Sequence, residues 1–406
     1  MSWTQKPLAE VAELCLGKML DEKKNKGELM PYLANVNVRW GKFDLDGLRE
    51  MRFEPHERER YGLKSGDIVM CEGGEPGRCA IWKDEVPGMM IQKALHRIRP
   101  REELDHRFLY YQFLLKGRAD GFSGLFTGST IKHLPGQNLA KVEVSYPSRS
   151  EQERIAEVLS AYDDLIENNR RRIALLEESA RLLYREWFVH LRFPGHEHVK
   201  MVEGLPEGWS RKRLAELVSP QYGFTETAST DMIGPKFLRG TDINKRSYVD
   251  WSSVPFCPID DQQKRKYALK RGDIVVIRMA DPGKVAIIEE DVDAVFASYL
   301  IRFNLVSDNL RPYYLFFSLD SEDYQAFVGG SSTGATRKTA NASLLTSFPL
   351  CVPTVALQME FEDSIKPLRG QITVLLRQNA KLRQARDLLL PRLMSGQIQP
   401  NDTSYA

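Results

Sequence analysis

The sequence has few cysteines, and their spacing excludes two common kinds of cysteine site. Five cysteines occur among 406 residues, at positions 15, 71, 79, 257 and 351, and none forms a CxxC pair. Neither a zinc site nor a disulfide framework is therefore indicated. The opening residues, MSWTQKPLAE, lack the apolar core of a signal peptide, and no apolar run approaches the roughly 18 residues that span a bilayer. We expect a protein of the reducing cytoplasm that does not enter a membrane.

The motifs of nucleotide hydrolysis and DNA methylation are also missing. The sequence has no GxxxxGK[ST] phosphate loop and no Asp/Asn-Pro-Pro-Tyr run typical of adenine-N6 methyltransferases. The acidic residues at 260–261 and at Glu72 and Glu75 are poorly spaced for a nuclease. His196-Glu197-His198 has no third or fourth metal ligand beside it, so a solvated linker explains it better. We expect a non-catalytic chain that binds no cofactor and no metal.

Charge of one sign is not in excess. Lysine and arginine total 57 against 55 for aspartate and glutamate, which gives a formal net charge of +2. Net charge alone therefore does not indicate nucleic-acid binding. Any binding to a polyanion must rest on local clusters, or on a partner with its own positive surface.

The chain contains a second copy of its own pattern. Trp3 begins WTQKPLAEV and Trp209, 206 positions later, begins WSRKRLAEL. The same separation recurs at LKSGDIV (63–69) and LKRGDIV (269–275), at Pro76-Gly77 and Pro282-Gly283, at Thr127-Gly128 and Thr333-Gly334, and at Gln152 and Gln358. Such regular anchors indicate a tandem duplication. The period is too long for a solenoid repeat, so each half is a domain with a connector.

Each half is predicted to be a mixed α/β domain followed by one long helix. The expected elements are short opening helices near Leu8 and Leu214, extended stretches at 32–38 and 237–244, strands at 67–71 and 273–277 that return after a Pro-Gly turn, helices at 106–115 and 311–319, and last strands ending at Pro147 and Pro353. We expect domains at 1–150 and 209–355, long helices at 151–190 and 356–395, a linker at 191–208 and a tail at 396–406.

The two long helices carry a heptad pattern. Core positions run from Ile155 to Trp187 and from Phe361 to Leu393 in alternating steps of four and three. The residues that depart from apolar are Asn169, Asn379 and Arg386. Each helix follows one domain and carries an apolar seam. The two seams are most simply buried if the helices pack on each other.

The two asparagines set the register of this pair. Because a buried amide is least costly opposite another amide, Asn169 is paired with Asn379, which requires antiparallel helices. The same register pairs the ends of the two seams, Ile155 with Leu393 and Trp187 with Phe361. The expected fold is therefore α+β, a pseudo-twofold tandem duplication of two α/β domains joined by an antiparallel coiled coil, with the domains at opposite ends of a rod.

These features together resemble the specificity subunit of type I restriction-modification systems. The resemblance rests on the GDIV…PG…AI block in both halves, the loops TGSTIKHL and TGATRKTANASL, and the connector QERIAEVLSAYDDLIENNRRRIALLEESARLLYREWF. The second connector departs from the pattern, with LPRLM in place of YREWF. The resemblance covers essentially the whole chain, and no single block of it is specific by itself.

The resemblance implies two target recognition domains, each reading one half of a split asymmetric DNA site. The coiled coil would dock two adenine methyltransferase subunits, which would in turn support restriction subunits. S-adenosylmethionine, ATP and magnesium are then expected on those partners. A rival interpretation is a non-catalytic scaffold whose twin domains bind protein ligands.

Loop cations, amides and aromatics are the candidate DNA contacts, because phosphate contacts hold register and Arg, Asn, Gln and Lys read base edges. In the first half they are Arg39, Trp40, Lys42, Arg78, Lys132 and His133. In the second half they are Arg239, Asn244, Lys245, Arg246, Lys284, Arg337 and Lys338. Arg78 and Lys284 occupy equivalent places after the Pro-Gly turns. Ordinary exposed loop charge, and a purely structural role for the Thr-Gly pairs, remain open alternatives.

Overall fold

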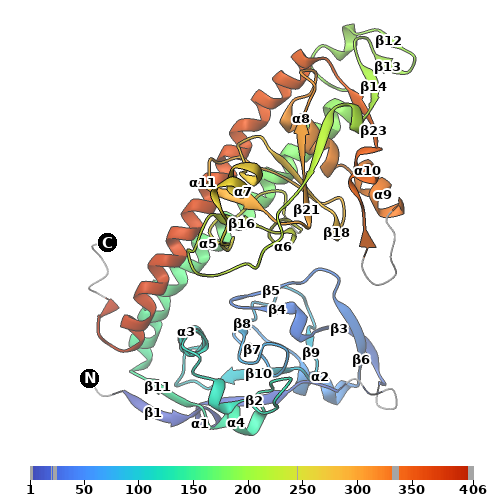
Figure 1. Cartoon of the computed structure of the whole chain (residues 1–406). Helices are drawn as coiled ribbons and strands as arrows, with labels where there is room; N and C mark the ends of the chain where they lie inside the picture. Colours follow the sequence, from blue (N-terminus) through green and yellow to red (C-terminus); the bar gives the residue numbers. More distant parts are fainter. Residues whose placement is uncertain (1–2, 20, 22–24, 245, 332–337, 401–406) are drawn as a thin grey trace. The chain divides into compact units, whose positions relative to one another are not determined.

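The chain folds into two compact units of mixed helix and sheet, which places it in the α+β class (Figure 1). The computed structural model describes residues 3–19, 21, 25–244, 246–331 and 338–400. The first unit comprises Met1–Ile166 with Lys381–Ala406, and the second comprises Glu167–Ala380. The two longest helices, α5 (Arg149–Tyr184) and α11 (Val355–Met394), each contribute to both units. Among the described residues, no helix is both long and apolar enough to cross a membrane.

The first unit is built around a four-stranded sheet in the order β2-β10-β7-β8. Its strands are β1 (Thr4–Pro7), β2 (Ala12–Leu16), β3 (Glu28–Leu33), β4 (Val38–Arg39), β5 (Lys42–Phe43), β6 (Arg49–Phe53), β7 (Ile68–Cys71), β8 (Cys79–Ile81), β9 (Met90–Ile91), β10 (Leu95–Pro100) and β11 (Glu143–Tyr146). Its short helices are α1 (Leu8–Val11), α2 (Pro55–Tyr61), α3 (His106–Arg118) and α4 (Gly136–Ala140). Strands β6, β3 and β9 form a second sheet, and β1 pairs with β11.

The second unit repeats this plan with the order β15-β21-β17-β19. Its strands are β12 (Met201–Val202), β13 (Leu205–Pro206), β14 (Ser210–Arg213), β15 (Val218–Tyr222), β16 (Lys236–Leu238), β17 (Ile274–Ile277), β18 (Met279–Ala280), β19 (Val285–Ile287), β20 (Ala294–Phe296), β21 (Leu300–Leu305), β22 (Lys338–Thr339) and β23 (Pro349–Val352). Its short helices are α6 (Gly240–Ile243), α7 (Asp261–Tyr267), α8 (Pro312–Asp320), α9 (Glu322–Ser331) and α10 (Ala342–Thr346). Strand β14 pairs with β23 as β1 pairs with β11.

The GDIV strands form the centre of each domain because both of their faces are buried. All four residues of β7 are enclosed, as are those of β17. In β7, Ile68 and Met70 pack in the core that includes Phe108 of α3, while Val69 and Cys71 face a separate core around Trp82. A continuous run of apolar residues is what such a doubly covered strand requires. The site loops that follow this strand therefore start from a rigid position.

The extended stretches expected at 32–38 and 237–244 are wrong in part. Strands β3 and β16 end at Leu33 and Leu238, and each is followed by a short helical turn, 35–37 in the first unit and α6 in the second. Side-chain capping turns the chain there: Asn37 Oδ1 accepts from the amide of Ala34 at 2.9 Å, and Asp242 Oδ2 accepts from that of Arg239 at 2.8 Å. A polar residue that closes the first turn of a helix competes with the strand ladder.

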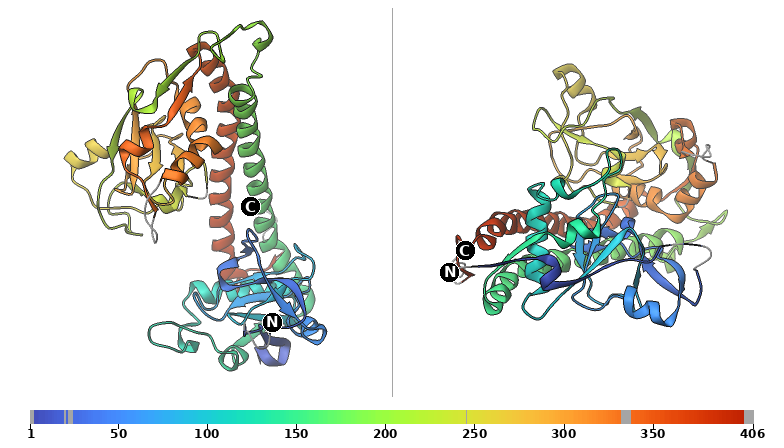
Figure 2. Two further views of the ribbon diagram at one scale, coloured as in Figure 1. Left: turned by 90° about the vertical axis from the view of Figure 1, so that its right-hand side faces the viewer. Right: turned by 90° about the horizontal axis from the view of Figure 1, so that it is seen from below.

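Within the second unit, α5 and α11 pair through the two asparagines. Asn169 Nδ2 donates to Asn379 Oδ1 at 3.0 Å, and both residues are buried. Farther along, the rings of Trp187 and Phe361 lie 5.8 Å apart. The residue number rises on one helix as it falls on the other, so this pair is antiparallel (Figure 2). Both contacts are those expected from the heptad register.

Within the first unit, the other ends of the same helices also pack together. Ile155 of α5 shares one buried core with Leu390 and Leu393 of α11. Arg386, which interrupts the apolar seam, forms an ion pair with Asp163. This pairing has the same antiparallel sense as in the second unit.

Candidate DNA-binding loops

In each unit the turn after the GDIV strand meets the segment that ends the Thr-Gly loop. In the first unit Gly73 bridges to His133, and the amide of Leu134 donates to Glu72 O at 2.7 Å. In the second unit β18 pairs with β22, with Met279 opposite Thr339. The positions 279 and 339 are each 206 residues after 73 and 133. Two loops that the sequence predicts separately thus form one surface in each unit.

The Thr-Gly loop of the first unit is a closed, exposed hairpin. The amides of Thr127 and His133 donate reciprocally to each other's carbonyls at 2.8 and 2.9 Å. Gly128 has φ +88°, and a Cβ there would lie 2.2 Å from the carbonyl oxygen of Ile131, so only glycine fits. Every residue from 127 to 132 is exposed, including Lys132. The equivalent Thr333-Gly334, and the candidate Arg337, lie outside the described residues.

Two histidines, His133 at the end of this hairpin and His96 on β10, hold the hairpin in place. His133 Nδ1 lies 3.1 Å from Glu72 Oε2, so this candidate is tied to the neighbouring turn. His96 is buried and its Nε2 lies 2.8 Å from the carbonyl of Leu134. Burial lowers the pKa of His96 below its ordinary value, so the ring is neutral near pH 7 and can donate its Nε2 proton to that carbonyl.

The Pro-Gly turns have a structural role in both units. Gly77 and Gly283 have φ values of +90° and +96°, and their amides donate to the carbonyls of Cys71 and Ile277. A Cβ on Gly77 would lie 2.9 Å from the Phe122 ring. The glycines therefore allow the chain to reverse close to its own core.

The two cations that follow these turns differ in their surroundings. Arg78 has a side chain only 14% exposed, donates to Asn35 O at 3.0 Å and forms an ion pair with Glu75. Its guanidinium ties two loops together rather than facing solvent. Lys284 is exposed, and no ion pair involves it in the described part of the chain. Equivalent sequence positions therefore do not offer equivalent DNA contacts here.

The β4–β5 hairpin carries three candidate residues. Lys42 is exposed, whereas Arg39 and Trp40 contact other parts of the first unit. Trp40 packs beside Gly117 of α3, where a Cβ would lie 2.5 Å from the indole ring. Arg39 reaches Asp44 at 4.0 Å and donates to its neighbour's carbonyl. Lys42 is exposed. We infer that Trp40 anchors the hairpin while Lys42 faces outward.

In the second unit, Arg239 and Asn244 are bound to acidic residues. Arg239 donates to Asp242 at 2.9 Å, and Asn244 Nδ2 lies 3.3 Å from Asp281 Oδ2 on the Pro-Gly turn. Arg246 is exposed, 3.9 Å from Asp250. The candidate Lys245 lies outside the described residues. Lys338 is exposed on β22, directly beside the turn.

Sequence reasoning missed an arginine and two tyrosines at this surface. The Arg278 guanidinium lies 5.1 Å from the centre of the Tyr222 ring, and its main chain bonds both Tyr299 and Ala340. Tyr222 and Tyr299 are 44% and 51% exposed. Arginine stacked on an exposed aromatic ring suits bases and phosphates alike. The available signal was the charge change at one position, since Arg278 stands where the first half has Glu72.

The acidic residues in these segments bind other groups of the protein, and the buried cysteines are unreactive. Asp260 caps α7 by accepting from the Gln263 amide at 2.8 Å. Glu54, His56 and Glu57 come close enough for a metal ion, but Glu57 already binds Lys18 and the Glu54 amide. Burial raises the pKa values of the free thiols of Cys71 and Cys79, which keeps them protonated.

A buried glutamine joins each long helix to its domain. Gln152 accepts from the Asp105 amide at 2.8 Å and donates to the carbonyls of Glu103 and Pro147, both at 3.0 Å. Gln358 makes the same three bonds, at 2.9 Å each, to main-chain groups of Arg311, Asn309 and Pro353. Both glutamines are 0% exposed, and every partner is displaced by 206 positions.

Comparison with known proteins agrees with the motifs. Residues 1–178 match the type I restriction modification DNA specificity domain. The chain is 25% identical over 354 residues to the type I restriction enzyme MjaIX specificity subunit of Methanocaldococcus jannaschii, covering 82% of this chain and 78% of that one. It is 23% identical over 391 residues to the EcoBI specificity subunit of Escherichia coli, covering 90% and 79%.

A solved structure supports the fold. The S subunit of a type I restriction-modification system from M. genitalium superposes with a TM-score of 0.54 at 15% identity, covering 97% of this chain and 96% of that one. The chain is thus similar, over residues 1–178, to the type I restriction modification DNA specificity domain. The resemblance to type I specificity subunits that the motifs indicate is confirmed.

Proposed function

We propose that this chain is a sequence-specific DNA-binding specificity subunit of a type I restriction-modification complex. The two halves are then target recognition domains derived from one ancestor, each reading one half of a bipartite, asymmetric DNA site. The observation that carries this proposal is the shared loop surface: the same two segments meet in each unit, 206 positions apart.

The side chains on the two loop surfaces differ where the scaffolds agree. The first presents Glu72, His133 and Lys132, while the second presents Arg278 and Lys338 beside exposed tyrosines. Base readout depends on the donors and acceptors offered, so one scaffold with two sets of side chains suits two different half-sites. The similarity to specificity subunits makes the rival scaffold function the weaker explanation.

We assign α5 and α11 to spacing and docking. As an antiparallel coiled coil, the helices would set the distance between the recognition domains and bind two adenine methyltransferase subunits, through which restriction subunits would join. The chemistry of S-adenosylmethionine, ATP and magnesium would then belong to those partners. The Asn169–Asn379 pair and the two buried glutamines support this assignment, because they fix the helices to each other and to their domains.

Salt-dependent DNA binding tests the proposal. The chain, assembled with its cognate methyltransferase subunits, is titrated against a duplex carrying the site found by mapping methylated adenines in cells that hold the complete system. Fluorescence anisotropy at several salt concentrations should give affinities that fall linearly on a log–log plot, because phosphate contacts release counterions. An assembled complex whose binding is absent, or independent of salt and sequence, would refute the function.

A further inference from the structure

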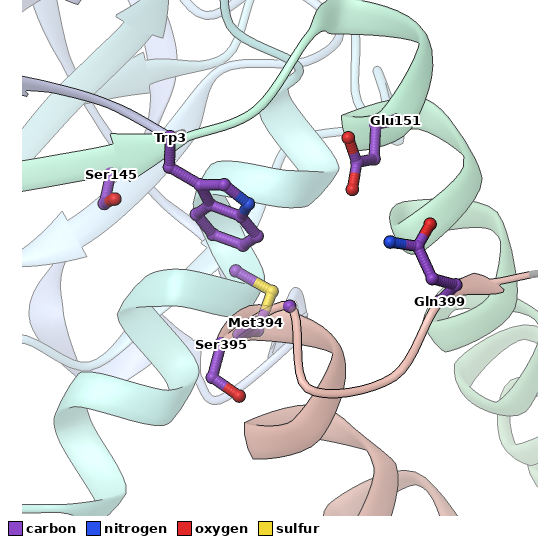
Figure 3. A pocket seen from close by; sticks show the side chains of 7 residues that line it. Trp3, Ser145, Glu151, Met394, Ser395 and Gln399 are labelled. Carbon is purple, nitrogen blue, oxygen red and sulfur yellow. The ribbon is translucent and has the colours of Figure 1, made fainter. Parts of the chain in front are cut away.

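The first unit contains a cavity that the proposed function does not use. Seven residues enclose a volume of about 370 Å³ (Figure 3): Trp3, Ser145, Glu151, Met394, Ser395, Gly396 and Gln399. They come from the segment before β1, from β11, from the first turn of α5, from the last residue of α11 and from the segment that follows α11. The cavity is partly open, so a group from another molecule can enter it.

Glu151 is the unusual member of this lining. It is only 7% exposed, and its side chain makes no hydrogen bond or ion pair within the described residues. Figure 3 shows its carboxylate directed into the space beside Trp3. A carboxylate that lines an open cavity and has no partner within the described residues can accept a charged hydrogen bond from a bound cation.

The second half of the chain has apolar packing at the positions that correspond to this cavity. Trp209 corresponds to Trp3 and packs against Phe188 at 6.0 Å and Phe193 at 5.7 Å. Leu357 corresponds to Glu151 and is buried in the same core.

The first unit replaces each of these apolar groups. Met394 and Gln399 stand where the second half has the two phenylalanines, and Glu151 stands where it has leucine. Trp3 still packs beside Phe108, but a hollow with a carboxylate at its side lies where the second unit has the contact around Trp209. The difference lies in one unit only, so it is not required by the fold that the units share.

We propose that this cavity binds the guanidinium group of an arginine side chain from a methyltransferase subunit. A carboxylate beside an indole ring suits this group, since a planar guanidinium can bond a carboxylate through two donors while it stacks on an aromatic face. The aliphatic part of the arginine would lie beside Met394, which is itself only 7% exposed. This inference rests on the proposed function, because that function supplies the partner.

Substitutions at Glu151 test the inference. E151L installs the residue of the second half, so the variant should fold with unchanged or raised thermal stability. E151Q keeps the shape and removes the charge. Both should weaken binding of purified methyltransferase subunit by about tenfold or more, the effect of losing a charged hydrogen bond. E143Q, at the exposed first position of β11, removes the same charge elsewhere and should bind as the unaltered chain does.

A second measurement identifies the arginine. In complexes formed at saturating concentration, phenylglyoxal should modify one methyltransferase arginine with E151L that is protected with the unaltered chain. Changing that arginine to lysine should weaken assembly with the unaltered chain and have little further effect with E151L. Folded E151L that assembles normally, or the absence of such an arginine, overturns the site but leaves the proposed function intact. An unaltered chain that binds neither methyltransferase nor DNA would instead overturn the proposed function.

Discussion

Gln152 is the residue whose loss should most affect the joint between α5 and its domain. Gln152→Ala would leave one amide and two carbonyls without partners inside the protein, so we expect the free energy of unfolding to fall by about 2 kcal/mol or more. Urea denaturation measures the change. Gln262→Ala, at an exposed position on α7, is the control and should stay within about 0.5 kcal/mol. Equal losses in both variants would contradict the role given to Gln152.

Arg278 is the residue that we expect to matter most for DNA binding by the second unit. Arg278→Ala should cost about 1–3 kcal/mol of binding free energy, and the loss should be confined to one half-site. Anisotropy titrations with duplexes altered in either half-site measure both effects. Arg265→Ala removes an exposed arginine from α7 and should change neither. If both variants weaken binding equally at both half-sites, Arg278 acts only through its charge.

Residues that recur at the same offset in both halves can be located from the sequence, although their roles cannot. Gln152 and Gln358 could be found by their common offset, and their partners recur at the same offset. The sequence could not show that Arg78 is held inside the protein while Lys284 is exposed. The carbonyl that binds Arg78 belongs to Asn35, 43 positions away. The role of Arg278 likewise depends on Tyr222, brought beside it by the pairing of strands distant in the sequence.

At the scale of elements, the paired asparagines give a test of the helix register. Asn169→Leu would leave the Asn379 amide against an apolar side chain, which should lower the free energy of unfolding by about 1–3 kcal/mol. Replacing both asparagines with leucine removes both amides and should cost less than the single change. Thermal or urea denaturation of Asn169→Leu, Asn379→Leu and the double variant measures this order. A double variant less stable than either single variant would contradict the pairing.

The elements predicted best were those with a strong period. The heptad steps located α5 and α11, and the buried run after Gly-Asp located β7 and β17. The turns at 35–37 and α6 were missed, because a single capping side chain outweighs the strand propensity of its neighbours. Arg369 of α11 was also missed. It is 1% exposed, and its partner Glu289, at 2.7 Å, lies 80 positions away in the sequence.

For the whole molecule, the duplication predicts independent reading by the two domains. Exchanging residues 209–355 for those of a relative with another specificity should change only one half of the methylated site. Glu289 and Ser247 should be retained in the exchanged segment, because the side chains of both accept hydrogen bonds from the buried Arg369 of α11. Mapping methylated adenines in cells carrying the exchanged chain measures the result. A change in both half-sites, or in neither, would contradict independent reading.

The glutamine joints have a consequence for how such a protein can change over generations. Gln152 and Gln358 bond only to main-chain groups: every amino acid supplies the carbonyls, and every one except proline supplies the amide. Domain side chains that do not bond the helices, unlike Glu289, can therefore diverge, or arrive by recombination between genes, while the glutamine joint is kept. Selection for a new DNA target is in this way separated from selection for the joint. A newly acquired domain can bond the glutamine of its helix at once, through its main chain.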